Sequence, residues 1–456
     1  MNRFPIRLVP WEELFFYKHR PSYPATFFAF FQFSQPLQRE LAEEALRVVS
    51  RKHPLLRSIV HRRGTQLFWE PATPPTFHWA NQPVTIEDLP HGNLDITAEP
   101  GLKIWAFDGS NSENAKDRSA TIQVLIHHVA FDGLGILQIL IDWLELYQEL
   151  QRSGEQTWGE RPIAETSLAF RCRPQLGWLE SIRLLPGQWK SIRAAFEMLG
   201  RRAIALGTGA PLVEQHPRKP QVVRCQFDGD ATLQLKKYAA ARSAALNSVL
   251  VRDLLITINQ WQRTLPEIPA GSHLRIMIPI NERGAEHHTG SACNHCTMIN
   301  LERRPAETEN ASELLVGIEQ EMDVIQKWKL SLNFWRALSL FRWLPNGLRR
   351  IQNSEIAATA SLTNLGRLRL TSSLAARHLD PPNSNHLLRL TNFEIVPPLL
   401  HGTMAAFAVA YLHNELKITL QYDPHHLTSE QAQELMQLYH AVLSANITTL
   451  HSEVDP

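Results

Sequence analysis

The sequence predicts a mixed α/β protein, of α/β or α+β class, built from two layered lobes. The chain has 456 residues, which is more than one small core needs. Hydrophobic residues make up 44% and charged residues 20%, as in an ordinary compact protein. Strand-like and helix-like segments alternate in both halves, which favours layered lobes. We expect an N-terminal lobe over 1–176 and a C-terminal lobe over 177–456, with connecting segments near 151–176 and 207–220.

The first half begins with a predicted buried strand and an amphipathic helix. The aromatic run Thr26–Phe33 is short and follows a proline, which favours a strand. Apolar residues at three-to-four-residue spacing predict a helix over Arg39–Lys52, and the following His53-Pro54 ends it because the residue before proline disfavours helical geometry. Further elements are a hairpin of strands at 56–61 and 65–69, strands at 102–107 and 120–128, and a helix at 134–150.

The second half repeats this order of elements without a sequence repeat. A strand at Val222–Phe227 precedes a single long helix predicted over Ala231–Gln262. The remaining predicted elements are strands at 274–280, 298–301, 360–363, 387–394, 404–412 and 416–422, and an amphipathic helix at 429–443.

Charge and composition exclude several classes of function. The chain has 46 Lys and Arg against 45 Asp and Glu, which gives no reason to expect nucleic-acid binding. Four cysteines do not form a secreted disulfide framework, and no signal-peptide core follows the N-terminus. No segment reaches the roughly 18 to 20 apolar residues of a membrane span. We expect a cytoplasmic protein, with peripheral membrane contact left open.

The motif that carries chemistry is His-His-x-x-x-Asp-Gly at 127–133, which would arise by chance about a few times in a thousand. Because side chains alternate along a strand, His127 and His128 should point to opposite faces and serve different purposes. A histidine titrates near neutral pH, so it can take a proton from a hydroxyl or amine and return it to a leaving thiolate. This predicts general-base chemistry where a strand ends and a helix begins.

Two residues of the motif also have simple structural interpretations. Asp132 precedes a predicted helix and could be its N-cap, and Gly133 could permit a tight turn. A lone histidine would more often be a buried core residue, and the spacing of the whole motif reverses that preference. We expect Asp132 to organise the loop instead of touching substrate.

The heptad resembles the signature of the condensation-domain and coenzyme-A-dependent acyltransferase superfamily. Two weaker segments are similar to the same family: Arg51–Arg57, like its helix-to-strand segment, and Leu416–Asp423, like its last strand. The resemblance covers nearly the whole chain. It implies a pseudo-dimer of two chloramphenicol-acetyltransferase-like lobes in a V, with the active site at the seam and tunnels reaching His128 from both faces.

The resemblance also implies roles for individual residues. The second histidine, His128, is the base in this family, and the aspartate, Asp132, pairs with an arginine of the other lobe, for which Arg283 is the matching residue. The segment 361–366 is similar to a second-lobe loop near the tunnel and supplies Thr363, Asn364 and Gly366. Thr363 stands before Asn364 where serine is usual in the family.

The function that the resemblance implies is acyl transfer from a thioester to an alcohol or amine, with ester formation favoured and a lipid-like chain compatible. The co-substrate would be acyl-coenzyme A or an acyl-phosphopantetheine on a carrier protein, with no bound cofactor, and the enzyme would be a stand-alone monomer. The plant-type Asp-Phe-Gly-Trp-Gly motif is absent. Two alternatives are a noncatalytic condensation-like domain that binds a carrier protein or acyl ligand, and a stand-alone condensation enzyme that forms amides.

Two other segments have competing interpretations. The segment 286–296 holds three histidines and two cysteines, but a second paired cluster is missing, so we predict no metal site there. The segment 324–354 is free of acidic residues between its ends and interleaves basic with aromatic residues, and 178–202 is similar. Each is either an amphipathic helix with its aromatic face in the core or a surface for an anionic partner such as lipid, coenzyme A or a carrier protein.

Overall fold

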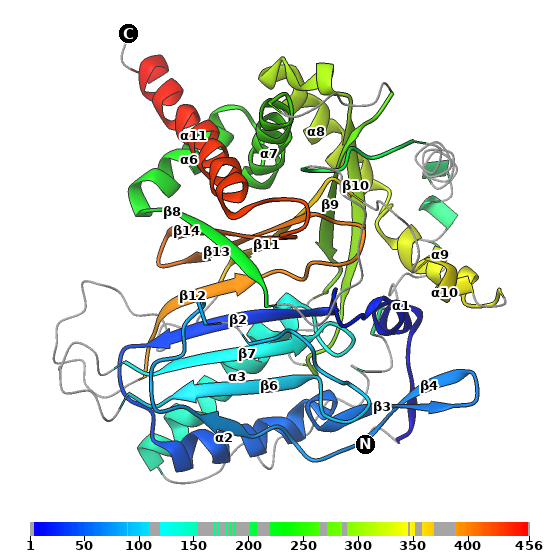
Figure 1. Cartoon of the computed structure of the whole chain (residues 1–456), viewed down its shortest axis with the longest axis vertical. Coiled ribbons are helices and arrows are strands. Elements are labelled where there is room, and N and C mark those ends of the chain that lie inside the picture. Colours follow the sequence, from blue (N-terminus) through cyan, green and yellow to red (C-terminus); the bar gives the residue numbers. More distant parts are fainter. Residues whose placement is uncertain are drawn as a thin grey trace.

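The chain folds into two lobes stacked on one another (Figure 1), each with its own β-sheet. The segments 286–289 and most of 151–176, 178–202 and 207–220, singled out above, lie outside the described residues. The computed structural model describes residues 4–88, 90–109, 119–153, 168, 171–172, 179, 182–184, 186–187, 201–207, 219–264, 271–284, 290–344, 347–351, 358–368 and 388–454.

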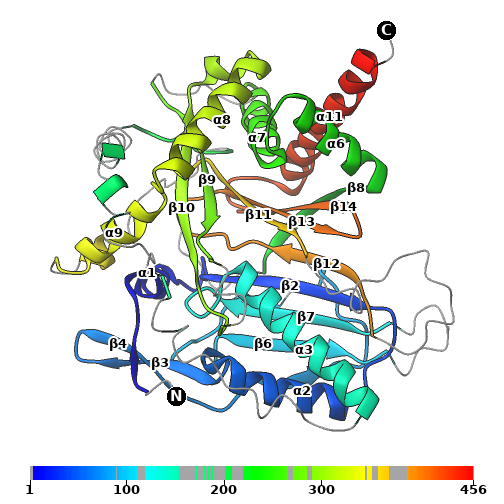
Figure 2. The same cartoon turned by 180° about the vertical axis from the view of Figure 1, so that it is seen from behind.

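The first lobe contains a five-stranded sheet in the order β12-β2-β7-β6-β5. Figure 2 shows two helices, α2 and α3, on one face of this sheet, and their apolar side chains share its core. The predicted strand and helix at 26–33 and 39–52 are confirmed with the same bounds. The elements are β2 (Thr26–Phe33), β5 (Phe77–Trp79), β6 (Leu102–Phe107), β7 (Thr121–His127), β12 (Leu390–Val396), α2 (Arg39–Lys52) and α3 (Gly133–Ser153).

A small three-stranded sheet and one short helix complete this lobe. The predicted hairpin is present, but its first strand begins at Ser58 because Pro54–Arg57 form a 3₁₀ turn. The helix α1 (Pro10–Lys18) was not among the expected elements; its side chains Trp11, Leu14 and Phe15 are buried against the lobe. The small sheet consists of β1 (Ile6–Arg7), β4 (Gln66–Pro71) and β3 (Ser58–Arg63).

The second lobe has a six-stranded sheet in the order β10-β9-β11-β13-β14-β8, covered by α6, α7, α8 and α11 (Figure 1). All predicted strands of this half are present, several of them longer than expected. The strands are β8 (Gln221–Phe227), β9 (Leu274–Asn281), β10 (Cys296–Arg303), β11 (Ala360–Arg367), β13 (Ala405–Leu412) and β14 (Glu415–Tyr422). The helices are α6 (Gly229–Ala241), α7 (Leu246–Gln262), α8 (Ala311–Lys327), α9 (Leu332–Phe341), α10 (Gly347–Ile351) and α11 (Ser429–Val454).

The prediction of one helix over Ala231–Gln262 is wrong. The chain breaks after Ala241, and Ser243 has a positive φ of 51°, a left-handed conformation that a continuous helix of L-residues does not accept. The break lets α6 and α7 both pack against α11. The segment 241–245 contains no proline or glycine, so the sequence has no helix-breaking residue at the break.

One strand crosses between the lobes. β12 comes from the C-terminal half of the chain but pairs antiparallel with β2 of the first lobe, with Phe393 opposite Phe31. The crossing strand satisfies the backbone groups at an edge that would otherwise be unpaired. The division into 1–176 and 177–456 therefore does not hold for β12, and the boundary itself lies outside the described residues.

A buried hydrogen bond also links the lobes near the last strand. The Tyr23 hydroxyl donates to Asp423 Oδ2 at 2.5 Å, and Asp423 directly follows β14.

None of the helices in the described part of the chain has the length and apolar character needed to cross a bilayer.

Candidate active site at the seam of the two lobes

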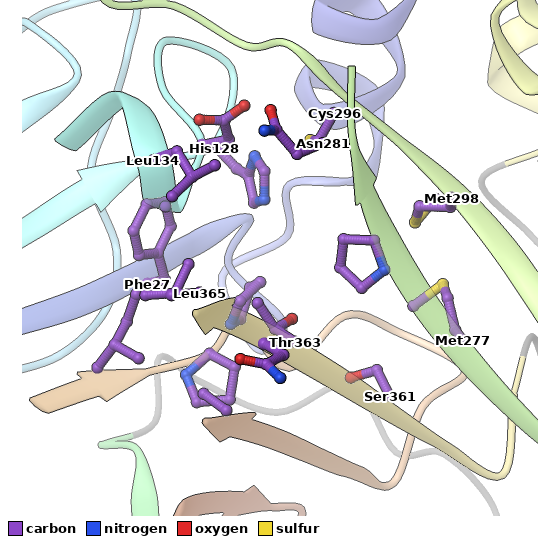
Figure 3. A pocket seen from close by; sticks show the side chains of 18 of the residues that line it. Phe27, His128, Leu134, Met277, Asn281, Cys296, Met298, Ser361, Thr363 and Leu365 are labelled. Atoms are coloured by element: carbon purple, nitrogen blue, oxygen red, sulfur yellow. The ribbon is translucent and has the colours of Figure 1, made fainter. Parts of the chain in front are cut away.

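A pocket lies between the lobes and takes its walls from both (Figure 3). From the first lobe come the turn between β7 and α3, with His128, and the aromatic side chains Phe15 and Phe27. From the second lobe come strands β9, β10 and β11 and the chain that follows β12. Most of the lining is apolar, and its members include Leu134, Met277, Ile280, Met298, Leu365, Ile395, Pro397, Pro398 and Leu400.

The backbone of His128 is fixed from two sides. β7 ends at His127, and the backbone N–H of His128 donates to the carbonyl of Ala25 at 2.8 Å. On the other side, Asn294 Nδ2 donates to the carbonyl oxygens of His128 at 2.9 Å and of Val129 at 3.0 Å. Because Asn294 belongs to the second half of the chain, the position of His128 depends on both lobes.

The imidazole of His128 is held between aromatic rings. It stacks on Phe15 with ring centroids 4.1 Å apart and lies tilted to Phe27 at 5.4 Å. Its Nδ1 is buried and makes no hydrogen bond of good geometry to the described residues. Burial lowers the pKa of His128 from its ordinary value; Asp132, the residue's own backbone carbonyl and Asn294 act in the opposite direction without reversing the shift. The ring is therefore neutral at neutral pH, the form that can accept a proton.

His127 has a different environment, as the strand alternation predicts. Its ring is buried, stacks on His19 at 4.8 Å, and does not line the pocket. Its Nδ1 accepts a hydrogen bond from the Val129 N–H at 3.2 Å. Burial, with His19 and His128 nearby, places its pKa well below the ordinary value. These contacts stabilise the turn, so His127 has a structural role beside the pocket.

Asp132 and Arg283 form an ion pair across the seam. Arg283 Nη2 lies 2.7 Å from Asp132 Oδ1, and Nη1 lies 3.0 Å from Oδ2. The carboxylate also accepts the backbone N–H groups of Gly135 and His295, each at 2.8 Å. Burial raises the pKa of Asp132, but Arg283 and these N–H groups outweigh it, and the net pKa is lowered. Asp132 thus caps α3 and also ties the turn to the second lobe.

Gly133 matters through its packing against the second lobe and not through turn geometry. It does not have a positive φ. A Cβ atom at this position would stand 2.6 Å from Leu365 Cδ2, well inside contact distance. The interpretation of Gly133 as a residue that permits a tight turn is therefore wrong; the missing side chain leaves space for a pocket residue of the other lobe.

The segment 361–366, expected in a loop near the tunnel, lies instead in strand β11. Thr363 and Asn364 line the pocket, whereas Gly366 does not. Gly366 has a φ of +68°, and its N–H donates to Asn364 Oδ1 at 2.8 Å. Asn364 Nδ2 donates to Asn247 Oδ1 at 3.1 Å. Both ends of the Asn364 amide are therefore engaged by the protein, and the neighbouring Thr363 also lines the cavity.

Comparison with known proteins places this arrangement in a known fold. No family model and no curated protein matches the sequence. The trichothecene 15-O-acetyltransferase of Fusarium sporotrichioides matches in structure with a TM-score of 0.71, at 12% identity, over 96% of this chain and 94% of that chain. The first condensation domain of the CDA synthetase matches with a TM-score of 0.66, at 12% identity, over 98% and 97%. The chain has the condensation-domain fold.

A third match shows how much of the chain takes part in the condensation-domain fold. The epimerization domain from the third module of tyrocidine synthetase B has a TM-score of 0.66 at 13% identity, over 99% of this chain and 98% of that chain. The predicted fold class of two chloramphenicol-acetyltransferase-like lobes is confirmed. Because these identities are so low, the likeness concerns the fold, and this fold carries more than one reaction.

Asn281 is a pocket residue that the sequence analysis missed. Its Oδ1 accepts the backbone N–H of Arg283 at 3.1 Å and Arg283 Nη1 at 3.3 Å. This fixes which end of the amide is oxygen, since the guanidinium can only donate. Figure 3 shows Asn281 at the same end of the pocket as His128. Asn281 precedes Arg283 by two positions on an extended strand end, so alternation from the predicted Arg283 could have identified it.

The cysteine- and histidine-containing segment before β10 supports the ion pair. Arg283 Nη2 donates to the carbonyl of Cys293 at 2.7 Å, and the His295 N–H binds Asp132. The segment is anchored in turn by His53, whose Nδ1 accepts the Ala292 N–H at 2.9 Å and whose Nε2 lies 2.8 Å from Asp142 Oδ2.

Metal and thiolate chemistry have no observed support in this pocket. Among the described residues, no group of three His, Cys, Asp or Glu side chains could hold a metal ion. Cys296 lines the pocket, but burial raises the pKa of its thiol well above the ordinary value. It is therefore a neutral thiol and a poor nucleophile at neutral pH.

Proposed function

We propose that this protein transfers an acyl group from a thioester to an alcohol or amine, with His128 as the general base. The observation that carries the proposal is the buried imidazole of His128, stacked on Phe15 and lining an apolar pocket built by both lobes. An acetyltransferase and a condensation domain of the same fold support this class of reaction.

The proton transfer uses the Nε2 atom of His128, because Nδ1 is enclosed. The acceptor hydroxyl or amine gives its proton to Nε2 as its oxygen or nitrogen attacks the thioester carbonyl carbon. The carbonyl electrons move onto oxygen and form a tetrahedral oxyanion. When this collapses, the carbon–sulfur bond breaks and the leaving thiolate takes the proton from His128. The base ends each cycle neutral, and general-base assistance of this kind contributes roughly 10²- to 10⁴-fold in rate.

Asn281 is the side chain that we assign to the oxyanion. Its Oδ1 is held by Arg283, so its Nδ2 is the end available to the cavity. A donor fixed before the reaction stabilises the developing charge without a reorganisation cost. Arg283 and Asp132 do not touch the reacting atoms in this mechanism; they position Asn281 and the His128 turn.

The pocket also bears on the substrates. Its apolar walls fit an acyl group or an apolar acceptor. Coenzyme A and a carrier protein both present the acyl group as a phosphopantetheine thioester, so either could be the donor. Ester formation remains our preferred outcome over amide formation. Identifying small molecules that copurify with the protein by mass spectrometry would name the acyl chain or acceptor.

The test compares wild type with His128→Ala on acyl-coenzyme A and acyl-carrier-protein donors and a panel of alcohols and amines. Thiol release and product mass are both measured. His61→Gln is the matched control, because this histidine is exposed on β3 and does not line the pocket. We expect a loss of at least 100-fold for His128→Ala. Turnover by His128→Ala at the wild-type rate would refute the role of His128, and acyl-ligand binding without any wild-type turnover would favour the noncatalytic alternative.

A further inference from the structure

A cluster of exposed apolar side chains lies at the end of α9. Leu340, Phe341, Trp343 and Leu344, here called the α9 tip, are 67%, 40%, 87% and 49% exposed. The opposite face of the same helix is buried in the first lobe's core through Leu332, Trp335 and Leu338. One face of the helix is therefore in the core, as the amphipathic interpretation of the basic aromatic stretch expected, and its end is exposed. A contiguous exposed patch of large apolar residues commonly marks an interaction site.

A hollow lined by arginines adjoins the α9 tip. Arg7, Arg62, Arg342 and Arg349, here called the arginine hollow, line one cavity together with Trp343 and Leu344. Glu13 is the acidic residue in this lining, and it is paired with Arg342 at 2.5 Å. The hollow therefore carries a net positive charge.

Two of these arginines lie against aromatic rings of α1. Within the described part of the chain, neither of the two is paired with a carboxylate. The Arg62 guanidinium lies 5.9 Å from the Phe16 ring centroid, and Arg349 lies 5.3 Å from that of Tyr17. A guanidinium on an aromatic ring keeps its charge and its outward N–H donors, which suit a phosphate group.

Helix α1 connects this surface to the catalytic pocket. Glu13 and Tyr17 line the arginine hollow, while Phe15 of the same helix lines the pocket and stacks on His128. Figure 1 shows α9 and α10 beside α1 at the side of the molecule where the lobes meet. A partner bound at the α9 tip would lie one helix away from the candidate active site.

We infer that the α9 tip and the arginine hollow form a docking surface for an anionic phospholipid bilayer. Tryptophan and leucine insert at the boundary of headgroups and acyl chains, and arginines beside them bind the phosphates. A soluble anion such as coenzyme A would use the hollow but would leave the four apolar side chains in water. The inference does not depend on the acyl-transfer reaction, although it would bring the pocket close to a source of apolar substrates.

The test measures cosedimentation of the full chain with vesicles of phosphatidylcholine alone and of phosphatidylcholine with phosphatidylglycerol. We expect binding to the anionic vesicles that weakens as salt is added. Trp343→Ser with Leu344→Ser should weaken this binding roughly tenfold or more. Arg62→Gln with Arg349→Gln should weaken it about fivefold for each arginine, and only on anionic vesicles.

Matched controls come from the second lobe. Leu233→Ser on α6 removes an apolar side chain that is 47% exposed, and Arg263→Gln removes an exposed arginine; neither should change vesicle binding. Equal binding of wild type and the α9-tip variant would overturn the inference. So would absence of vesicle binding together with binding of coenzyme A or inorganic phosphate that is lost in the arginine variant, because the hollow would then be a site for a soluble anion.

Discussion

Arg283 of the second lobe and Asp132 of the first form a two-pronged ion pair, with N···O distances of 2.7 and 3.0 Å. The side chains of both are almost fully buried, at 5% and 6% exposure. The ion pair therefore links the two lobes, because it holds the turn that carries His128 against the strand end that carries Asn281. Breaking a buried pair by removing one partner leaves an uncompensated charge, which commonly costs about 3–5 kcal/mol.

We predict that Arg283→Met destabilises the protein by about 3–5 kcal/mol. Asp132→Asn with Arg283→Met should be less destabilised than the sum of the two single variants, because neither buried charge then remains. Urea unfolding of the wild type, both single variants and the double variant completes the cycle. Additive effects would contradict an energetic coupling between these residues.

The acidic limb of the pH–rate profile should report His128. Burial lowers its pKa in the folded protein, so the neutral, basic form persists to lower pH than for an ordinary histidine near 6.5. We therefore expect the midpoint of the acidic limb of kcat/KM to lie below pH 6.5. The pH profile of kcat/KM reports groups of the free enzyme. A midpoint at or above pH 6.5 would show that a group other than His128 titrates.

Removing the amide donor of Asn281 should slow the chemical step. Asn281→Asp keeps an oxygen for Arg283 but loses the N–H group, and Asn281→Ala loses both. We expect a fall of roughly 10²- to 10³-fold in kcat for each, with little change in KM, because the lost contact exists in the transition state. Asn310→Ala is the control, because this exposed amide caps α8 and does not line the pocket. A change in KM alone would assign Asn281 to substrate binding.

Adding a methyl group at Gly133 should push Leu365 into the pocket. The new Cβ would stand 2.6 Å from Leu365 Cδ2, and the end of a leucine side chain can move at a cost of about 1–3 kcal/mol. We expect Gly133→Ala to lower kcat/KM by more, expressed as a free energy, than it lowers the free energy of unfolding. Adding Leu365→Ala to the Gly133→Ala variant should restore kcat/KM. Failure of the second substitution to rescue activity would mean that Gly133 acts through the backbone.

The sequence by itself determined those elements whose patterns are local. A short aromatic run after a proline predicted β2, apolar periodicity predicted α2, and strand alternation separated His127 from His128. Each of these signals is carried by neighbouring residues. Resemblance to a family added Arg283 as the partner of Asp132, and the ion pair in the structure joins these two residues.

Tertiary structure decided what depends on contacts between distant segments. The pairing of β12 with β2 followed from an open sheet edge, and the tight packing at Gly133 followed from Leu365 of the other lobe. The break near Ser243, which lets two helices pack on α11, was also seen only in the structure. Local patterns record which side of an element is buried, but they do not record which surface buries it, and that choice is made only when both lobes pack together.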